Sequence, residues 1–173
     1  RGLEPCLQFR ASDLIGILNG IDMDLWNPSK DTAIPHLINQ ESPLTGKAIC
    51  KEYLKNEFGL NSGKDLPLFG VVSRLYHQKG LDLLTSILKK LLKSNTAQFI
   101  ILGSGSPEEE DNFTKLAQEF PHNLGLKIGF DDQLARRIFA GTDFFIMPSR
   151  FEPCGLAQQY AMRYGSVPVA RDT

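Results

Sequence analysis

From residue 66 onward, short apolar runs alternate with longer segments whose apolar residues recur every three or four positions. The runs lack polar alternation, which is typical of strands buried on both faces of a parallel sheet. We expect strands at residues 66–72, 98–102, 124–128, 144–147 and 167–170. We expect helices at about residues 81–93, 108–120, 133–140 and 153–164, each with an apolar face or a helix start signal. Strands and helices alternating at this spacing predict an α/β fold with a Rossmann-like, doubly wound parallel sheet.

The first part of the chain has a different pattern. The apolar run at residues 15–18 predicts a short buried strand, and Asn19-Gly20 after it is a strong turn signal. Residues 22–43 are rich in proline and poor in periodic apolar positions, so we expect an extended connector on the surface, with Trp26 packed down onto the domain.

We therefore divide the chain into an incoming segment with its connector, residues 1–43, and a domain, residues 44–173. The domain should begin with an amphipathic helix at residues 46–58. The chain does not start with Met and its last residues follow directly on an apolar strand, so we expect a piece of a longer protein.

Composition excludes several classes of protein. The chain has 173 residues, 42% of them hydrophobic, which suits one domain with a core. The net charge of -1 lacks the basic excess of a nucleic-acid-binding surface. No apolar run approaches the roughly 20 residues of a membrane helix, and no signal peptide is visible. Three cysteines without CxxC spacing and three scattered histidines speak against a disulfide framework or a metal site.

Glu152 is the first candidate for chemistry. It follows the apolar run 144–147 and Pro148, at a turn from a strand to a helix in which Pro153 and Gly155 read as early helical positions. Such a corner lies at the carboxyl end of a parallel strand, where ligands bind, beside backbone N–H groups that lack helical partners. A lone glutamate there is more often a helix cap favoured by the dipole.

Arg74 and Lys79 are the second candidate. Five residues apart in one strand-to-helix loop, they can direct two positive charges to one point, which suits a diphosphate, although two solvated cations are an equally common reading. Phe130 could present an aromatic face to a base, but taken alone it reads as core. The Gly103-Ser104-Gly105 loop lacks the third glycine of a dinucleotide fingerprint, because Glu108 stands there.

Five segments of the chain together resemble bacterial glycogen synthases and plant starch synthases. They are Leu18-Asn19-Gly20-Ile21-Asp22 with Trp26-Asn27-Pro28, Gly70-Val71-Val72-Ser73-Arg74-Leu75 with Gln78-Lys79-Gly80-Leu81-Asp82, Arg137-Ile138 with Ala140-Gly141-Thr142-Asp143, Pro148-Ser149-Arg150-Phe151-Glu152-Pro153-Cys154-Gly155-Leu156, and Arg163-Tyr164-Gly165 with Val167-Pro168-Val169. The resemblance covers essentially the whole chain.

This resemblance implies a glycosyltransferase of the two-domain GT-B type, with two Rossmann-like domains facing each other across a cleft. The chain would be most of the C-terminal, donor-binding domain. Members of the family transfer glucose from ADP-glucose to the non-reducing end of an α-1,4-glucan with retention of configuration, without a catalytic metal or other cofactor. They act in the bacterial cytoplasm on glycogen or in plastids on starch.

The resemblance also assigns roles to residues. Arg74 and Lys79 would hold the ADP diphosphate and stabilise its departure, and Glu152 would bind hydroxyls of the donor glucose. Phe130 would stack on adenine, where many relatives have tyrosine. Further substrate contacts would come from N–H groups around Cys154, Gly155 and Leu156, and from Thr173, which stands at the start of a phosphate-contacting Thr-Gly-Gly loop. Because Cys154 stands near a helix start, where thiolates are favoured, we expect thiol reagents to modify it and bound ADP to slow that modification.

Two departures from the family pattern bear on function. Related glycosyltransferases carry a second glutamate eight residues after the first, and Tyr160 stands there, as in the synthase branch. The N-terminal domain, with its glycine-rich donor loop and acceptor contacts, is absent, so we expect this chain alone to be inactive. Two alternatives stay open: a retaining glycosyltransferase of the same architecture that uses a UDP- or GDP-sugar, and a non-catalytic scaffold in glucan synthesis.

Overall fold

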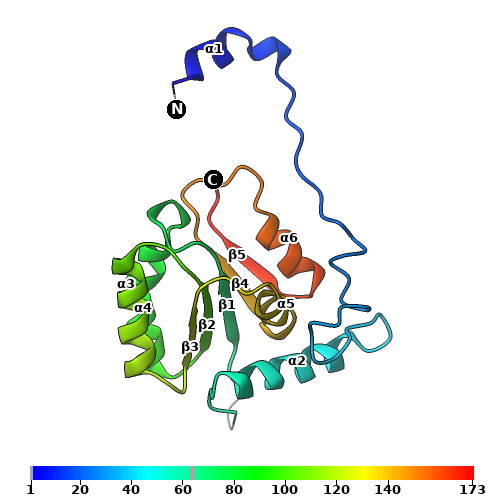
Figure 1. The fold of residues 1–173 in the computed structure, drawn as a ribbon, viewed down its shortest axis with the longest axis vertical. Helices are drawn as coiled ribbons and strands as arrows, with labels where there is room; N and C mark the ends of the chain where they lie inside the picture. Colours follow the sequence, from blue (N-terminus) through cyan, green and yellow to red (C-terminus); the bar gives the residue numbers. More distant parts are fainter. Residues whose placement is uncertain (1, 63–64) are drawn as a thin grey trace.

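The core of the chain is a five-stranded sheet, and all of its strand pairs are parallel. The computed structural model describes residues 2–62 and 65–173. The strands lie in the order β3-β2-β1-β4-β5 (Figure 1). Their bounds are β1 Leu68–Val72, β2 Gln98–Gly103, β3 Leu124–Ile128, β4 Phe144–Met147 and β5 Val167–Ala170. The predicted doubly wound parallel sheet is confirmed.

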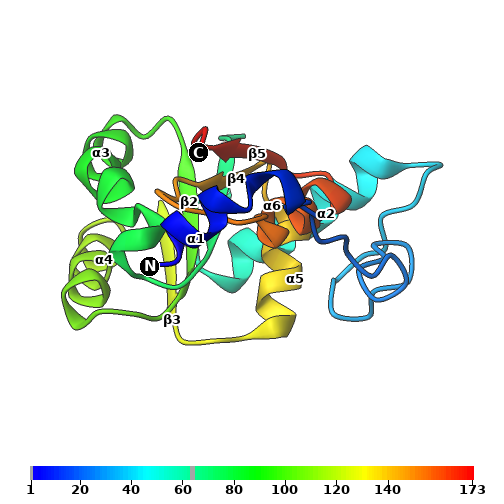
Figure 2. The same ribbon diagram turned by 90° about the horizontal axis from the view of Figure 1, so that it is seen from above.

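Helices cover the two faces of the sheet in two groups (Figure 2). On one face, α3 (Leu81–Ser94) and α4 (Pro107–Glu119) pack over β1, β2 and β3. On the other face lie α2 (Pro43–Glu57), α5 (Asp132–Gly141) and α6 (Leu156–Arg163). This division follows from the right-handed crossover, because the chain moves along the sheet in one direction from β1 to β3 and in the other from β3 to β5.

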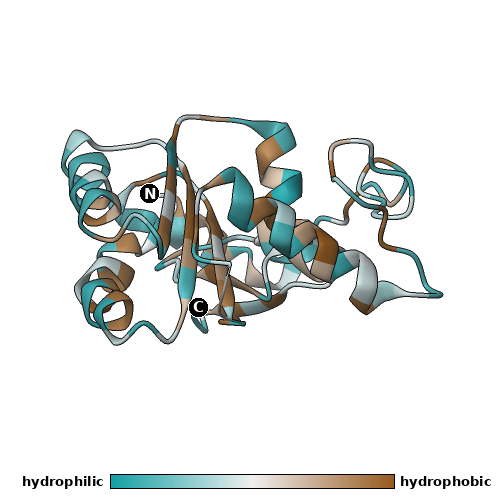
Figure 3. Ribbon diagram, turned by 90° about the horizontal axis from the view of Figure 1, so that it is seen from below, coloured by the Kyte–Doolittle hydropathy of each residue, from teal (hydrophilic) through white to brown (hydrophobic). Residues whose placement is uncertain are grey.

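The buried side chains form two clusters, one on each face. The cluster under α3 and α4 is built from one leucine stripe of α3 together with β2 side chains and Phe113. The other joins α2, α5 and α6 and contains fully buried Leu54, Phe145 and Tyr164. Figure 3 shows the strands as predominantly hydrophobic and the helices as mixed, with hydrophilic residues facing outward. The apolar runs read from the sequence therefore mark the central layer.

The connector between residues 22 and 42 contains turns but no strand, and it lies against α5 and α6 through Trp26. The Trp26 ring stacks on Tyr160 with centroids 3.8 Å apart, and the Arg136 guanidinium lies 4.1 Å from the Trp26 ring centroid. Buried Asp31 accepts hydrogen bonds from Arg136 and from the Tyr164 hydroxyl. The expected packing of Trp26 onto the domain is confirmed.

The prediction of a buried strand at residues 15–18 is wrong. This stretch is extended but pairs with no strand among the described residues, and Ile15, Ile17 and Leu18 are 87%, 88% and 77% exposed. Together with α1 (Glu4–Phe9) and the short 3-10 helix Ala11–Asp13, it forms an arm that leaves the domain (Figure 1). An apolar run indicates that burial of the segment is favourable, but it does not indicate that the residues that bury it belong to the same sheet.

Candidate functional site

The residues singled out from the sequence lie on loops at one edge of the sheet. Because every strand is parallel, the loops that follow β1, β3, β4 and β5 leave the same, carboxyl edge. These loops carry Arg74 and Lys79, then Phe130, then the segment 149–155, and finally Thr173. The fold thus brings together side chains that are up to 99 positions apart, from residue 74 to residue 173.

A cavity of about 370 Å³ collects the predicted groups of two of these loops. Its lining includes Arg74, Lys79, Glu152, Cys154, Gly155 and Leu156, all named from the sequence as site residues. The β1–α3 loop therefore faces the β4–α6 loop across a common space, as the direction of the two strands requires.

Lys79 and Glu152 form an ion pair within this cavity. Lys79 Nζ donates to Glu152 Oε2 at 2.6 Å, and the two side chains are only 18% and 16% exposed. Buried Ser149 donates its hydroxyl to the same Oε2 at 3.2 Å. At this degree of burial the pair gains more Coulomb energy than an exposed one, and its geometry is held by the additional hydrogen bond.

Arg74 presents the opposite situation. It is exposed, and its guanidinium has no hydrogen-bond or ion-pair partner within residues 2–62 and 65–173. It lines the 370 Å³ cavity and also a neighbouring one of about 200 Å³ that contains Phe130. Arg74 is consequently a permanent, available charge at the junction of the two cavities.

Phe130 lies at the mouth of this smaller cavity and is 91% exposed, so the alternative that it belongs to the core is wrong. Gly129 precedes it with a φ of 129°, and Asp131 follows as the N-cap of α5, accepting from Leu134 N at 2.9 Å. An aromatic ring held outside the core by a capped helix start is available to stack on a planar group.

The start of α6 differs from the prediction. The helix begins at Leu156, and Gly155 is its N-cap in a left-handed conformation with φ 78° and ψ 57°, so Pro153 and Gly155 are not early helical positions. The glycine turns the chain so that the segment before it can line the cavity while the first turn of the helix points its N–H groups toward the same side. The sequence did not show this, because Pro153 is compatible with a helix start.

A third cavity, of about 250 Å³, adjoins Glu152 on its other side and contains Ser149, Cys154, Arg171 and Thr173. The chain after β5 is thus brought next to the end of β4, where Arg171 N donates to Met147 O at 3.3 Å. Thr173 lines a cavity with Glu152 and not the one that contains Arg74 and Lys79, so its implied contact with the phosphates stays a prediction. Arg171 is an addition that sequence reasoning did not name.

Sequence reasoning also gave no role to Ser149 or Asn19. Ser149 stands inside the motif that drew attention to Glu152, and a hydroxyl three residues before a carboxylate in a tight turn was the available signal. Asn19 lies in the arm, lines the 370 Å³ cavity, and its carbonyl accepts from Gln159 Nε2 at 3.3 Å. Tyr160, which stands where related glycosyltransferases have a second glutamate, lines none of these three cavities. Its ring stacks on Trp26, so the tyrosine has a structural role at this position.

The Gly103-Ser104-Gly105 loop has a packing explanation. A Cβ on Gly105 would lie 2.1 Å from the carbonyl oxygen of Leu75, and Leu75 N donates to Ser104 O. The glycines let the exit loops of β2 and β1 touch, so close packing of the two loops accounts for them.

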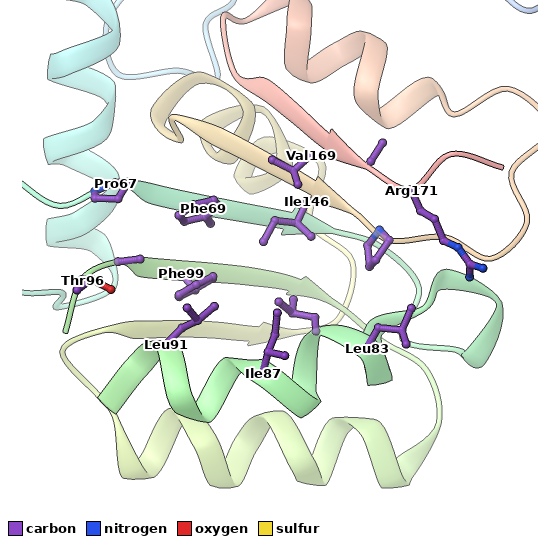
Figure 4. Close-up of a pocket in the computed structure, with 14 residues that line it drawn as sticks. Pro67, Phe69, Leu83, Ile87, Leu91, Thr96, Phe99, Ile146, Val169 and Arg171 are labelled. Carbon is purple, nitrogen blue, oxygen red and sulfur yellow. The ribbon is translucent and has the colours of Figure 1, made fainter. Parts of the chain in front are cut away.

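An apolar groove larger than these three cavities lies elsewhere on the described residues. It measures about 580 Å³ and lies on the sheet face between α3 and the ends of β4 and β5 (Figure 4). Its lining is almost entirely apolar, with side chains such as Phe69, Ile87 and Ile146 pointing into it. Since polar groups that could orient a nucleotide do not converge there, we do not place the site in this groove.

Two observations on the described residues concern metals and membranes. Within residues 2–62 and 65–173, no three His, Cys, Asp or Glu side chains are grouped in a way that could hold a metal ion. Among the helices of the same residues, none has the length and apolar character needed to cross a bilayer.

Comparison with known proteins places this geometry in a family. The model of the family "Glycosyl transferases group 1" matches residues 53–173, which include every candidate residue described above except Asn19. The chain belongs to the group 1 glycosyltransferases. The matched part includes the sheet, the helices from α3 onward and the loops at the carboxyl edge of the sheet.

Within this group, curated relatives of the chain are glycogen synthases. The chain is 51% identical over 171 residues to the glycogen synthase of Anaeromyxobacter dehalogenans (strain 2CP-C) and 47% identical over 171 residues to that of Lactococcus lactis subsp. lactis (strain IL1403). The alignments cover 98% and 99% of this chain but 35% of each relative. The chain therefore spans about a third of the length of these relatives.

Solved structures of group 1 enzymes and related proteins show the same fold. The catalytic domain of starch synthase IV from Arabidopsis thaliana, solved bound to ADP and acarbose, matches 99% of this chain with a TM-score of 0.92 and 41% identity, and the match covers 35% of that domain. WaaG, a glycosyltransferase of lipopolysaccharide biosynthesis, matches 89% of the chain with a TM-score of 0.60 and 20% identity, which shows the fold alone.

Proposed function

We propose that this chain is the donor-binding part of a glycogen or starch synthase that transfers glucose from ADP-glucose to the non-reducing end of an α-1,4-glucan with retention. The observation that carries the proposal is the convergence of Arg74, Lys79 and Glu152 on one cavity at the carboxyl edge of the sheet. The relatives at about half identity support it, as does the likeness to a starch synthase that was solved with ADP.

In this proposal the two cations have different tasks. Arg74 would bind phosphate oxygens in bidentate fashion, because its guanidinium has no partner within residues 2–62 and 65–173 and lies at the junction of two cavities. Lys79, already paired with Glu152, would contribute a fixed point charge next to the bond that breaks. Both charges stabilise the negative charge that develops on the departing diphosphate.

Glu152 would hold the donor glucose. The contacts from Lys79 and Ser149 both use Oε2, so within the described residues Oε1 is left to accept from a sugar hydroxyl. N–H groups at the start of α6, around Cys154, Gly155 and Leu156, would complete the polar contacts to the glucose, whereas Thr173 would contribute to binding of the phosphates. Phe130 would stack on the base, one cavity away.

The arm would contact the rest of the polypeptide. Its apolar residues, including Ile15, Ile17 and Leu18, are exposed here, and the likeness to the starch synthase domain covers 99% of this chain but 35% of that domain. We infer that an N-terminal domain covers these residues and supplies the glucan contacts. Because the acceptor side of the cleft would come from that domain, this chain alone should not elongate a glucan.

The test is calorimetric titration of the chain with ADP-glucose, ADP and UDP-glucose, repeated on Arg74→Ala with Lys79→Ala. We expect adenine nucleotides to bind and the double variant to lose binding by roughly 100-fold or more, since each charge-assisted contact is worth about 1.5–3 kcal/mol. Lys89→Ala, which removes an exposed lysine of α3 far from the cavity, should leave binding unchanged. Selective binding of UDP-glucose would instead assign the chain to a glycosyltransferase with another donor.

A further inference from the structure

A set of contacts outside the cavity joins the two loops that carry Lys79 and Glu152. The Arg150 guanidinium forms a two-pronged ion pair with Asp82, in which Nη1 donates to Oδ1 at 2.5 Å and Nη2 to Oδ2 at 2.6 Å. Nη1 also donates to the carbonyl of His77 at 2.9 Å. One side chain of the β4–α6 loop thus contacts His77 in the β1–α3 loop and Asp82 in the first turn of α3, one on each side of Lys79 along the chain.

The backbones of the two loops are also in direct contact. Arg150 N donates to Gln78 O at 2.9 Å, and Gln78 Nε2 donates to Phe151 O at 3.3 Å. Gly80, with a φ of 66°, approaches Pro148 so closely that a Cβ would lie 2.1 Å from the Pro148 carbonyl oxygen. Below, "loop clamp" means the Arg150–Asp82 pair together with the two hydrogen bonds of Gln78 and the close approach of Gly80 to Pro148.

The loop clamp lies beside the cavities and not in them. Neither Arg150 nor Asp82 lines any of the three cavities around Glu152 and Phe130. Yet Glu152 is two residues after Arg150, and Lys79 is three residues before Asp82. The clamp therefore joins the two segments within three residues of the groups that form the Lys79–Glu152 pair.

The exposure of the Arg150–Asp82 pair bears on what this pair contributes to the protein. Arg150 and Asp82 side chains are 26% and 37% exposed, so water screens the pair in part, and the two-pronged geometry is the one in which such a pair contributes most. Because the same guanidinium also binds the His77 carbonyl, its contacts fix the two loops relative to each other as well as stabilising the fold. Fixing two loops before a ligand arrives has a larger effect, because misplacing reacting or binding groups by about 1 Å can cost roughly 100-fold.

We propose that Arg150 and Asp82 are positioning residues, which hold the loops of Lys79 and Glu152 in register so that both groups meet a nucleotide sugar in one prearranged geometry. The nature of the ligand rests on the proposed function, whereas the coupling between the clamp and the Lys79–Glu152 pair does not. The expected signature is a loss of ligand affinity out of proportion to the loss of stability.

The first experiment measures ligand affinity. We expect Arg150→Ala and Asp82→Ala each to weaken ADP-glucose binding by roughly tenfold in calorimetry, with a small shift of the urea midpoint, and the double variant to be no weaker than either single one. The matched control is the exposed pair Lys89–Glu119, at 2.7 Å between α3 and α4. Unchanged affinity in both single variants, or an equal loss in Lys89→Ala, would overturn the inference.

The second experiment needs no ligand. A double-mutant cycle with Lys79→Met and Glu152→Gln measures the coupling of that pair from urea unfolding, first in the native chain and then with Arg150→Ala. We expect the coupling to fall to less than half without Arg150, and Arg150→Gln serves as the background if Arg150→Ala does not fold. Full coupling without Arg150 refutes the positioning role. Failure of the native chain to bind ADP-glucose, with coupling lost as expected, would refute only the proposed function.

Discussion

The two halves of the site are built in different ways. Around Glu152, the groups are paired and tied down: Lys79 and Ser149 both contact its carboxylate, and the loop clamp joins the two loops from behind. Around Phe130, the ring is 91% exposed, and the segment is held by the cap at Asp131 and by the hydrogen bond that Gly129 N donates to Gly103 O. Arg74 lines both halves.

This difference follows from the physics of the two kinds of contact. Charged and hydrogen-bonding groups act over short distances with strict geometry, so a site gains most when they are placed before the ligand arrives. Stacking on an aromatic face tolerates small displacements and needs only an accessible ring. A rigid half for diphosphate and sugar can therefore coexist with an open half for the base.

The largest effect is expected from breaking the rigid half at Gly80. Gly80→Ala places a Cβ 2.1 Å from the Pro148 carbonyl oxygen at a φ of 66°, so the loops must separate. We expect a loss of about 3 kcal/mol of unfolding free energy, measured in urea. Gly59→Ala is the control, since Gly59 has a φ of 63° with nothing within 4 Å of its Cβ, and should cost about 1 kcal/mol. Equal losses in the two variants would show that the close approach is not needed.

The open half should behave oppositely. Phe130→Ala removes a ring that is 91% exposed, so stability should not change, while ADP affinity should fall by roughly 10- to 100-fold through lost stacking of about 1–3 kcal/mol. Binding of inorganic diphosphate should stay the same, whereas Arg74→Ala should weaken it. Phe130→Tyr, which keeps the ring, is the matched control in calorimetry. Weaker diphosphate binding in Phe130→Ala would mean that the halves are not separate.

Alkylation of cysteines tests, without any substitution, whether the nucleotide binds beside Glu152. Cys154 lines two of the cavities next to Glu152, and Cys6 is exposed on the arm. With ADP at ten times its dissociation constant, labelling of Cys154 should slow about tenfold, because only the free protein reacts. Cys6 is the internal control in the same mass spectrum and should keep its rate. Equal rates for Cys154 with and without ADP would place the nucleotide elsewhere.

The smallest expected effect is on the stability of the fold at low pH, through Asp82. Hydrogen bonding to Arg150 lowers the pKa of Asp82 from its ordinary 3.8. A lowered pKa in the folded state means that the carboxylate stabilises the fold above its unfolded pKa, and that this contribution is lost as the pH falls through the lowered value. Asp82→Asn should therefore differ slightly from the native chain in urea midpoint at pH 6, and the difference should vanish in strong acid. A difference that persists there would have another origin.

Much of the fold could be predicted from local pattern. The five runs expected as strands from residue 66 onward are the five strands of the sheet, and their ends agree within two residues. Helices with a strong stripe, such as the one beginning at Leu81, were also predicted, because burial of one face imposes the 3.6-residue period directly on the sequence. Parallel strands then placed Arg74, Lys79 and Glu152 at one edge.

The failures share a physical cause. The run at residues 15–18 is apolar, yet its partner surface is not part of the described chain, and no local pattern shows what covers a segment. The prediction of Gly155 as a helical residue is wrong, because the residue type alone does not indicate which φ a glycine near a helix start adopts. Phe130 reads as core by composition, and only its place on a capped loop exposes it.

The alternation of strands and helices, the edge of the sheet where chemistry can occur, and the residue types at that edge can all be predicted from the amino-acid sequence. These follow from periodicity and from chain direction, which are local properties. The folded chain was needed to show that Lys79 and Ser149 contact the same oxygen of Glu152, that Arg74 stays available among the described residues, and that Arg150 contacts Asp82 across 68 positions. Those contacts depend on distances between loops that are remote in sequence, and such distances are fixed only when the whole sheet has formed.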